Sequence, residues 1–257
     1  MMLNFTVDTL PTITAQTALF LDFDGTLVEI AATPNLVEIP ADVIVSLSSL
    51  QLKLGGALAL VSGRTLSNLD PFVYPLRLPA AGEHGSQRRS ANGHLSLVTR
   101  VDLGTAVHAA QALVLQHPAL LLERKTSGIS LHYRQAPELE SICIAAMQAA
   151  VQHISGLELL RGKCVVELKP QAASKGGAIR EFMQEAPFAG RQCIFAGDDN
   201  TDESGFAAVQ SMGGQAIKVG TGTTAARYHC ASVTELASWL RAAATQPHLP
   251  SEQTVSA

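Results

Sequence analysis

The chain contains the stretch ALFLDFDGT at residues 18–26, in which an apolar run ends in two aspartates and a Gly-Thr turn. The apolar run favours a buried β-strand. Side chains two positions apart in extended backbone point the same way, so Asp22 and Asp24 are expected to share one site. Two carboxylates there suit a hard metal ion and an attack on phosphorus, with one acid as nucleophile and the other as proton donor. The alternative is a strand followed by an ordinary Asp-Gly turn.

Two further apolar runs end in polar residues in the same way. They are ALALVSGR at residues 57–64 and CIFAGDDNTDE at residues 193–203. Near-continuous apolar runs are typical of parallel strands covered on both faces, and ligands of such sheets lie beyond the carboxyl ends of the strands. We therefore expect Ser62 and Asp198 to lie beside Asp22.

A lysine stands at the start of a predicted helix. Residues 174–177 read SKGG, and apolar residues recur at helical spacing over residues 178–183. Lys175 would then lie at a helix N-terminus, where anions are already favoured. Taken alone, Lys175 could be a solvated surface residue and Ser62 a helix cap, but their order in the chain favours a phosphate site.

The ordered set Asp-x-Asp, Ser, Lys and Gly-Asp-Asp-x-x-Asp resembles the motifs of the haloacid dehalogenase superfamily, from about residue 18 to 240. Dehalogenases of that superfamily lack the second acid of the first motif, so Asp24 points to phosphoryl transfer. Three stretches are similar to the trehalose-6-phosphate phosphatase family, and to its stand-alone bacterial members: LHYRQAP at 131–137, GKCVVELKP at 162–170 and GDDNTDE at 197–203.

This resemblance implies the fold and the reaction. The fold would be α/β, with a Rossmann-like core around a parallel sheet and a small α+β cap inserted between Ser62 and Lys175. The reaction would be Mg²⁺-dependent hydrolysis of trehalose 6-phosphate through an aspartyl-phosphate. The resemblance makes Asp22 the nucleophile and Asp24 the acid and then the base. Ser62 and Lys175 would neutralise charge on the transferred phosphoryl group.

The metal site implied by the resemblance consists of oxygen ligands. Asp22, the backbone carbonyl of Asp24, and Asp198 would hold Mg²⁺. Asp199 and Asp202 would orient those ligands rather than bind the metal. For Asp199 a helix N-cap is an equal alternative.

Sugar recognition is expected from charged residues that match sugar-binding positions of the family. Rigid polar groups reject analogues that lack a hydroxyl better than apolar pockets do. The alternatives are cross-strand ion pairs within a small sheet, and a pair between Arg64 and a core acid. His84, His132 and His229 are interpreted as structural, although the loop of His84 is expected at the border of the cleft, and the roles of Glu83 and His84 stay open. The expected substrate-binding residues are Arg64, Glu123, Lys125, Arg134, Lys163 and Glu167.

Ser62 and Lys175 are separated by about 110 residues, far more than one crossover helix needs. The intervening segment predicts a helix, two strands, a second helix and two more strands, with strands at 120–123, 129–133, 157–160 and 164–169 and helices from about 102 and at 139–154. We therefore predict a core from residues 1–101 and 172–245, a cap from 102–171 and a flexible tail at 246–257.

Composition narrows the function classes. The 257 residues carry a net charge of −4, and 47% are hydrophobic. The acidic balance argues against a nucleic-acid partner, and no apolar run is long enough to span a membrane. The four cysteines lack metal-ligand spacing and suit a reducing cytoplasm.

We expect a monomer that acts on a small sugar phosphate. The core motifs do not distinguish the sugar, so a sucrose-phosphate or mannosylglycerate-phosphate phosphatase, a phosphomutase and a non-catalytic sugar-phosphate sensor remain alternatives. A pure sensor would not need the second acid.

Overall fold

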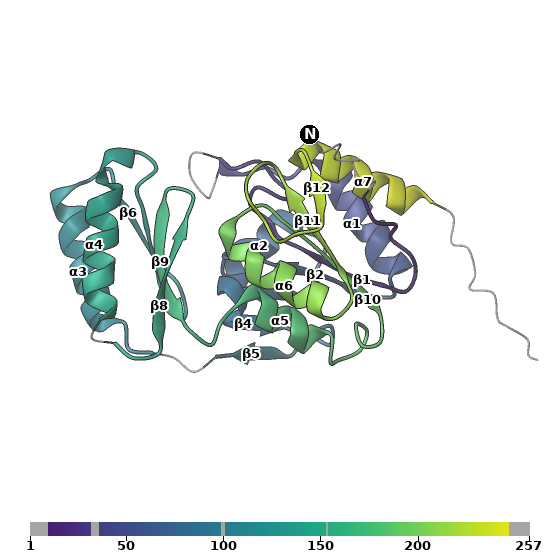
Figure 1. The fold of residues 1–257 in the computed structure, drawn as a ribbon, viewed down its shortest axis with the longest axis horizontal. Helices are drawn as coiled ribbons and strands as arrows, with labels where there is room; N and C mark the ends of the chain where they lie inside the picture. The colour runs from purple at the N-terminus through teal and green to yellow at the C-terminus, as the bar shows by residue number, and fades with distance from the viewer. Residues whose placement is uncertain (1–9, 32–35, 99–100, 153, 247–257) are drawn as a thin grey trace, which may run out of the picture.

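The structure is a computed structural model that describes residues 10–31, 36–98, 101–152 and 154–246. The described residues form two lobes, each with its own sheet and hydrophobic core (Figure 1). Segments from both ends of the chain build the larger lobe, the core, and the middle of the chain builds the smaller lobe, the cap. The predicted fold class, a parallel α/β core with an inserted α+β unit, is confirmed.

The core sheet has the strand order β12-β11-β10-β1-β2-β3-β4-β5. Its strands from β12 to β3 are parallel, and β4 and β5 are antiparallel to their neighbours. Every residue of β1 and β2 is buried, as the apolar runs predict. The strands are β1 (Thr17–Leu21), β2 (Leu58–Val61), β3 (Ala80–Gly82), β4 (Gln87–Arg89), β5 (Leu95–Leu97), β10 (Gln192–Gly197), β11 (Gln215–Val219) and β12 (Tyr228–Cys230).

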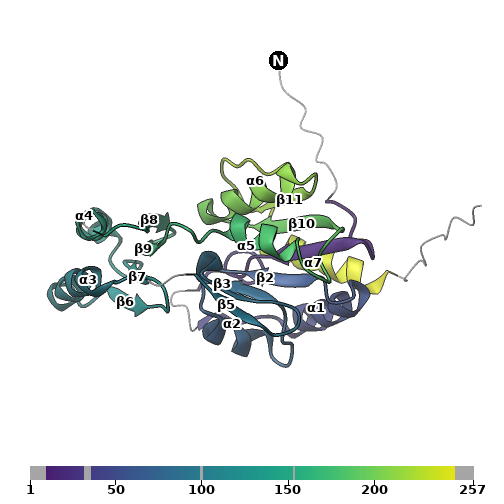
Figure 2. The ribbon, with the colours of Figure 1, turned by 90° about the horizontal axis from the view of Figure 1, so that it is seen from below.

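Helices cover both faces of the core sheet. Helices α5 and α6 lie on one face, and α1 and α7 pack together on the other (Figure 2). Phe182 of α5 contacts Phe20 of β1 and Phe188, with ring centroids 5.9 and 5.1 Å away, which fixes α5 on the sheet. The core helices are α1 (Ala41–Lys53), α2 (Leu66–Val73), α5 (Lys175–Phe182), α6 (Glu203–Ser211) and α7 (Val233–Thr245), with short 3₁₀ turns η2 (Glu83–Gly85) and η4 (Asn200–Asp202).

The cap is an antiparallel sheet in the order β6-β7-β9-β8, with two helices on its outer face (Figure 1). Two helix-strand-strand units form it, as predicted. The elements are α3 (Gly104–Gln116), β6 (Leu121–Arg124), β7 (Ile129–His132), η3 (Pro137–Leu139), α4 (Glu140–Val151), β8 (Leu157–Gly162) and β9 (Val165–Pro170).

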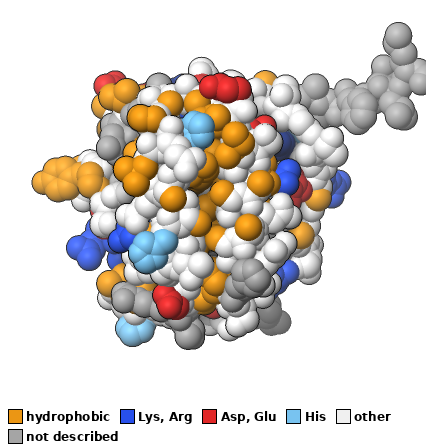
Figure 3. Space-filling view, turned by 90° about the vertical axis from the view of Figure 1, so that its left-hand side faces the viewer, with side chains coloured by type: hydrophobic (Ala, Val, Ile, Leu, Met, Phe, Trp, Pro, Cys, Tyr) orange, Lys and Arg blue, Asp and Glu red, His pale blue; other side chains and the backbone are white. Residues whose placement is uncertain are grey.

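The outer face of the cap carries many apolar and few charged side chains (Figure 3). Helix α3 has no acidic or basic residue besides His108, and Glu140 is the one charged residue of α4. The charged cap residues expected to bind sugar line a cavity that the cap shares with the core.

The domain boundaries at 102 and 171 stay a prediction, although both fall between elements of the two sheets. The expected tail lies outside the described residues, except for Gln246, which caps α7. Within the described ranges, no helix has the length and apolarity needed to cross a membrane.

Candidate active site

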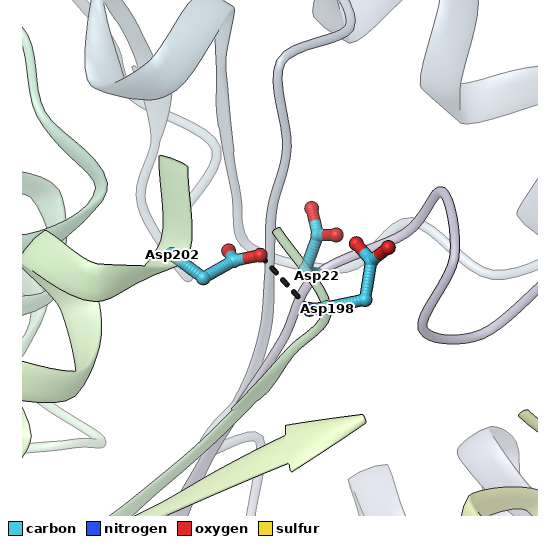
Figure 4. A group of neighbouring side chains, drawn as sticks. All are labelled: Asp22, Asp198 and Asp202. Atoms are coloured by element: carbon cyan, nitrogen blue, oxygen red, sulfur yellow. Dashed lines mark hydrogen bonds between the residues drawn. The ribbon is translucent and has the colours of Figure 1, made fainter. Parts of the chain in front are cut away.

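Parallel strand pairing brings the three motif ends together. Strand β1 lies between β10 and β2, with Leu21 opposite Ala196 and Leu60. Asp22, Ser62 and Asp198 follow these strands at one edge of the sheet, and all three are buried. Oxygens from Asp22, Asp198 and Asp202 lie within 4.8 Å of one another (Figure 4).

Asp202 is fully buried and its carboxylate is fully engaged. Its Oδ2 accepts the backbone N–H groups of Asp198 and Asp199, each at 3.0 Å, and its Oδ1 accepts from Lys175 Nζ at 2.7 Å. Asp199 is the N-cap of η4, because its side chain accepts the N–H of Asn200 at 2.6 Å. Asp199 therefore caps a helix, which is the alternative role expected for it. Asp202 fixes the loop that carries Asp198.

Lys175 is the positive charge among these acids. It begins α5, which Ser174 caps by accepting the N–H of Gly177 at 2.9 Å. Its Nζ also donates to Asp22 Oδ1 at 2.7 Å. Burial disfavours the charged amine, but Asp202 and Asp22 outweigh burial and raise the pKa of Lys175. Burial and the charge of Asp202 raise the pKa of Asp22, while Lys175 opposes them.

Asp24 forms a bidentate ion pair with Arg64. The Arg64 Nε donates to Oδ2 at 2.7 Å and an Arg64 terminal nitrogen to Oδ1 at 2.6 Å. The guanidinium also lies over the rings of Phe23 and Phe72, at 5.2 and 4.8 Å from their centroids. The alternative in which Arg64 pairs with a core acid is the arrangement seen, and Arg64 still lines the cavity described below.

The glycine after Asp24 is required by the close approach of the acids. Gly25 has φ of +81°, and a Cβ there would lie 2.1 Å from Asp198 Oδ2. A side chain at position 25 would therefore displace Asp198 from the cluster.

The acid cluster fits a hard divalent cation. Its donors are all carboxylate oxygens, which Mg²⁺ prefers, and no thiolate or imidazole belongs to the group. Burial and neighbouring acids also raise the pKa of Asp198, so negative charge at the cluster is only partly compensated. Asp202 has its oxygens occupied by Lys175 and two backbone amides, whereas Asp22 accepts from Lys175 and, at 3.3 Å, from Thr26, and the Asp198 carboxylate accepts from Lys163 alone among the side chains of the described residues.

One cavity of about 450 Å³ joins the core acids to the cap. Every residue expected at the site except Asp202 lines this cavity. From the core these are Asp22, Asp24, Ser62, Arg64, Lys175, Asp198 and Asp199, and from the cap Glu123, Lys125, Arg134, Lys163 and Glu167.

Lys163 and Arg134 of the cap are among the cap residues that contact the core. Lys163 Nζ donates to Asp198 Oδ2 at 2.5 Å, and this contact raises the pKa of Lys163 although burial opposes it. Arg134 donates to the backbone carbonyl of Ala31 and, at 3.3 Å, to that of Lys163. These contacts join the cap to the core beside the acid cluster.

Glu167 is the centre of a second network. Its Oε1 accepts from Lys125 Nζ and Ser130 Oγ, both at 2.9 Å, and its Oε2 lies 2.7 Å from His84 Nε2. Burial raises the pKa of Glu167, but Lys125 and His84 outweigh it and hold the pKa well below its usual range. An ionised Glu167 accepts only, so His84 donates through Nε2. Burial also lowers the pKa of His84.

Glu123 pairs with a histidine of the neighbouring strand. Its Oε2 lies 3.0 Å from His132 Nε2. Burial raises the pKa of Glu123, but His132 and Lys125 together lower it. Some cap residues thus form the ion pairs that the alternative interpretation expects, such as Glu123 with His132 and Lys125 with Glu167. These residues also line the cavity, where a ligand can reach them.

His84 and His132, which the sequence analysis interprets as structural, line the cavity. His229 lies exposed on β12. Sequence periodicity could not place His84, because it lies in the irregular turn η2. The available signal was the Glu-His-Gly stretch directly after the apolar residues that form β3. Asn68, Ile30 and Leu121 line the same cavity and carry no motif.

A family model described as trehalose-phosphatase matches residues 20–235 of the chain. The chain is 44% identical over 235 residues to the trehalose-6-phosphate phosphatase of Escherichia coli K12, covering 90% of this chain and 87% of the relative. It is 40% identical over 213 residues to a probable trehalose-phosphate phosphatase of Sinorhizobium fredii, covering 79% of this chain and 77% of the relative.

Solved structures share the fold. A trehalose-6-phosphate phosphatase related protein superposes with a TM-score of 0.70 at 28% identity, covering 88% of this chain and 96% of that chain. The C-terminal domain of Candida albicans trehalose-6-phosphate phosphatase gives 0.80 at 18% identity, covering 90% and 92%, which shows the fold alone. The chain is therefore a phosphatase of phosphoric monoesters, and it belongs to the trehalose-phosphatase family of the haloacid dehalogenase superfamily.

Proposed function

We propose that the protein hydrolyses trehalose 6-phosphate to trehalose and inorganic phosphate, with Mg²⁺ as cofactor and an aspartyl-phosphate intermediate. The observation that carries this proposal is the shared cavity, in which the core acids face five charged cap residues. The names of the two bacterial relatives support the choice of sugar.

In the first step, a carboxylate oxygen of Asp22 forms a bond to phosphorus while the bond from phosphorus to the sugar oxygen breaks. Asp24 gives its proton to the departing oxygen. Both Asp24 oxygens accept from Arg64 in the structure, so Asp24 has to exchange Arg64 for the leaving oxygen. We therefore propose that Arg64 holds Asp24 in place between turnovers.

In the second step, Asp24 takes a proton from water. The water oxygen bonds to phosphorus as the bond to Asp22 breaks, which releases phosphate and restores the Asp22 carboxylate and the protonated Asp24. Asp22 and Asp202 hold Lys175 in place by hydrogen bonds. Its positive charge would stabilise the negative charge of the phosphoryl group in both steps. Ser62, whose Oγ accepts the N–H of Arg64 at 3.2 Å, can donate its hydroxyl proton to a phosphoryl oxygen.

Asp22, the Asp24 carbonyl and Asp198 would hold Mg²⁺, with Asp199 and Asp202 supporting their loop. When bound, the ion would neutralise phosphoryl charge. Glu123, Lys125, Arg134, Lys163, Glu167 and Arg64 would bind the substrate.

We propose a monomer in the cytoplasm. Core and cap of the same chain line the cavity, so the proposed chemistry needs no residue of a second subunit. All four cysteines are free thiols, and three of them are buried, which suits a reducing compartment.

Phosphate release from a panel of sugar phosphates tests the substrate. We expect trehalose 6-phosphate to give a kcat/KM at least about tenfold above those of sucrose 6-phosphate, mannosylglycerate phosphate and glucose 6-phosphate. A higher value for another member of the panel would replace the substrate, and hydrolysis of none would favour a sensor.

A further inference from the structure

The turn η2 has an unusual backbone. Glu83, His84 and Gly85 have φ of +47°, +56° and +102°, a region that bulky residues seldom adopt. The N–H of Glu83 donates to the carbonyl of Arg64 at 2.8 Å, and the N–H of His84 to that of Ser62 at 3.0 Å. The loop that carries Ser62 therefore fixes this turn, which directs the Glu83 side chain to the cap.

The Glu83 carboxylate binds the turn between β6 and β7. Oε1 accepts the backbone N–H of Thr126 and Oε2 that of Ser127, both at 2.7 Å. Gln87 Nε2 donates to Glu83 Oε1 at 2.9 Å and also contacts Thr126 Oγ1 at 2.5 Å. Two consecutive amides of the cap thus meet one buried carboxylate of the core, 2% exposed.

This turn begins with Lys125, a residue expected to bind sugar. Lys125 Nζ donates to the Gly63 carbonyl at 2.8 Å and to Glu167. From the same core turn, His84 contacts the other oxygen of Glu167. Docking of the cap turn on Glu83 therefore sets where Lys125 and Glu167 lie over the cavity.

We propose that Glu83 is the receptor on the core for the β6–β7 turn of the cap, and that it positions Lys125 and Glu167 for the sugar. Glu83 does not belong to the described residues that line the cavity, so it acts without touching the substrate. The identity of that substrate rests on the proposed function. If Glu83 instead only braces η2 through Gln87, the cap would dock without it.

Amide hydrogen exchange measured by NMR tests the docking without substrate. In Glu83→Gln one carboxylate oxygen becomes an NH₂ group, which cannot accept from a backbone amide. We expect the Thr126 and Ser127 amides to exchange at least about tenfold faster in Glu83→Gln. The Lys125 amide, which donates to the Gly128 carbonyl at 3.0 Å within the same turn, should change less than about threefold.

Unchanged exchange at Thr126 and Ser127 in folded Glu83→Gln would overturn the proposal. If that variant does not fold, amide exchange at Thr126 and Ser127 of the wild-type protein, with and without trehalose, tests the docking instead. Slow exchange at both amides that slows further with added trehalose supports docking, whereas exchange at the rate of an unstructured peptide overturns it. These exchange measurements stand even if trehalose 6-phosphate proves not to be the substrate.

Steady-state kinetics distinguish a Glu83 that positions Lys125 and Glu167 for the sugar from a Glu83 that only stabilises the turn η2. In Glu83→Gln we expect KM for trehalose 6-phosphate to rise at least about tenfold while kcat stays within about threefold, because the lost interaction holds the sugar-binding residues and not the reacting groups. The matched control is Glu138→Gln, an exposed cap glutamate, which should change neither constant. A fall in kcat alone would contradict the proposal.

Discussion

Asp202 and Asp198 are neighbours in the acid cluster, yet their removal should have different consequences. Asp202→Ala deletes a fully buried carboxylate that holds Lys175 and the backbone amides of Asp198 and Asp199. Asp198→Ala deletes a carboxylate whose one side-chain partner among the described residues is Lys163, itself half-exposed. We expect Asp202→Ala to lower the stability of the core. We expect Asp198→Ala to weaken Mg²⁺ binding.

The size of each effect follows from these contacts. Breaking a buried ion pair by removing one partner costs about 3–5 kcal/mol, and Lys175 keeps Asp22, which favours the lower half of that range. The two lost amide bonds add about 1 kcal/mol each. Asp202→Ala should therefore lower the free energy of unfolding by about 5–6 kcal/mol, or the melting temperature by about 10–20 °C.

Asp198→Ala should change stability by less than about 1 kcal/mol, because it relieves repulsion in a cluster where acids raise one another's pKa. Its Mg²⁺ affinity should fall further than that of Asp202→Ala, for which the loss of a residue that supports the ligands predicts a fall of about tenfold to a hundredfold.

Urea denaturation in excess chelator measures the stabilities, and calorimetric titration with Mg²⁺ measures the affinities. Equal losses of Mg²⁺ affinity in both variants, with wild-type stability for Asp202→Ala, would show that Asp202 is a ligand and not a support.

Asp22→Asn should leave less than about one per cent of wild-type turnover while the circular dichroism spectrum stays native, since the amide cannot attack phosphorus; greater residual phosphate release would remove Asp22 as nucleophile. Excess chelator should abolish activity and added Mg²⁺ restore it, and full activity in chelator would refute a metal role. In chelator, the stability of Asp22→Asn relative to wild type should increase from about pH 4 to about pH 7 in denaturation experiments. The raised pKa of Asp22 means that its contribution to stability is lost as pH rises through that pKa; a flat difference would contradict this.

The core of the site could be predicted because it depends on local sequence and on parallel topology. Asp22, Ser62 and Asp198 each follow an apolar run, and the carboxyl ends of parallel strands share one edge. The cap elements could also be predicted, since each has its own periodicity.

Contacts between distant segments could not be predicted. The turn of Glu83 and His84 has no periodicity, and its contacts with Thr126 and Glu167 join residues 43 and 83 positions apart. The antiparallel strands β4 and β5 were missed because three-residue strands carry too little pattern. Whether Arg64 faces the substrate or Asp24 also depends on side-chain packing that no motif encodes.

The central claim is that the core performs the chemistry while the cap recognises the disaccharide, and Glu167→Ala tests it most directly. Glu167 has its charge stabilised by Lys125 and His84 on the cavity wall. The measurement is kcat/KM for trehalose 6-phosphate and for a small aryl phosphate, in wild type and variant. We predict that the ratio of the two values falls at least about a hundredfold, because the aryl phosphate is too small to reach the cap. A parallel fall for both substrates, matched by a lower melting temperature, would show Glu167 to be structural and contradict the account.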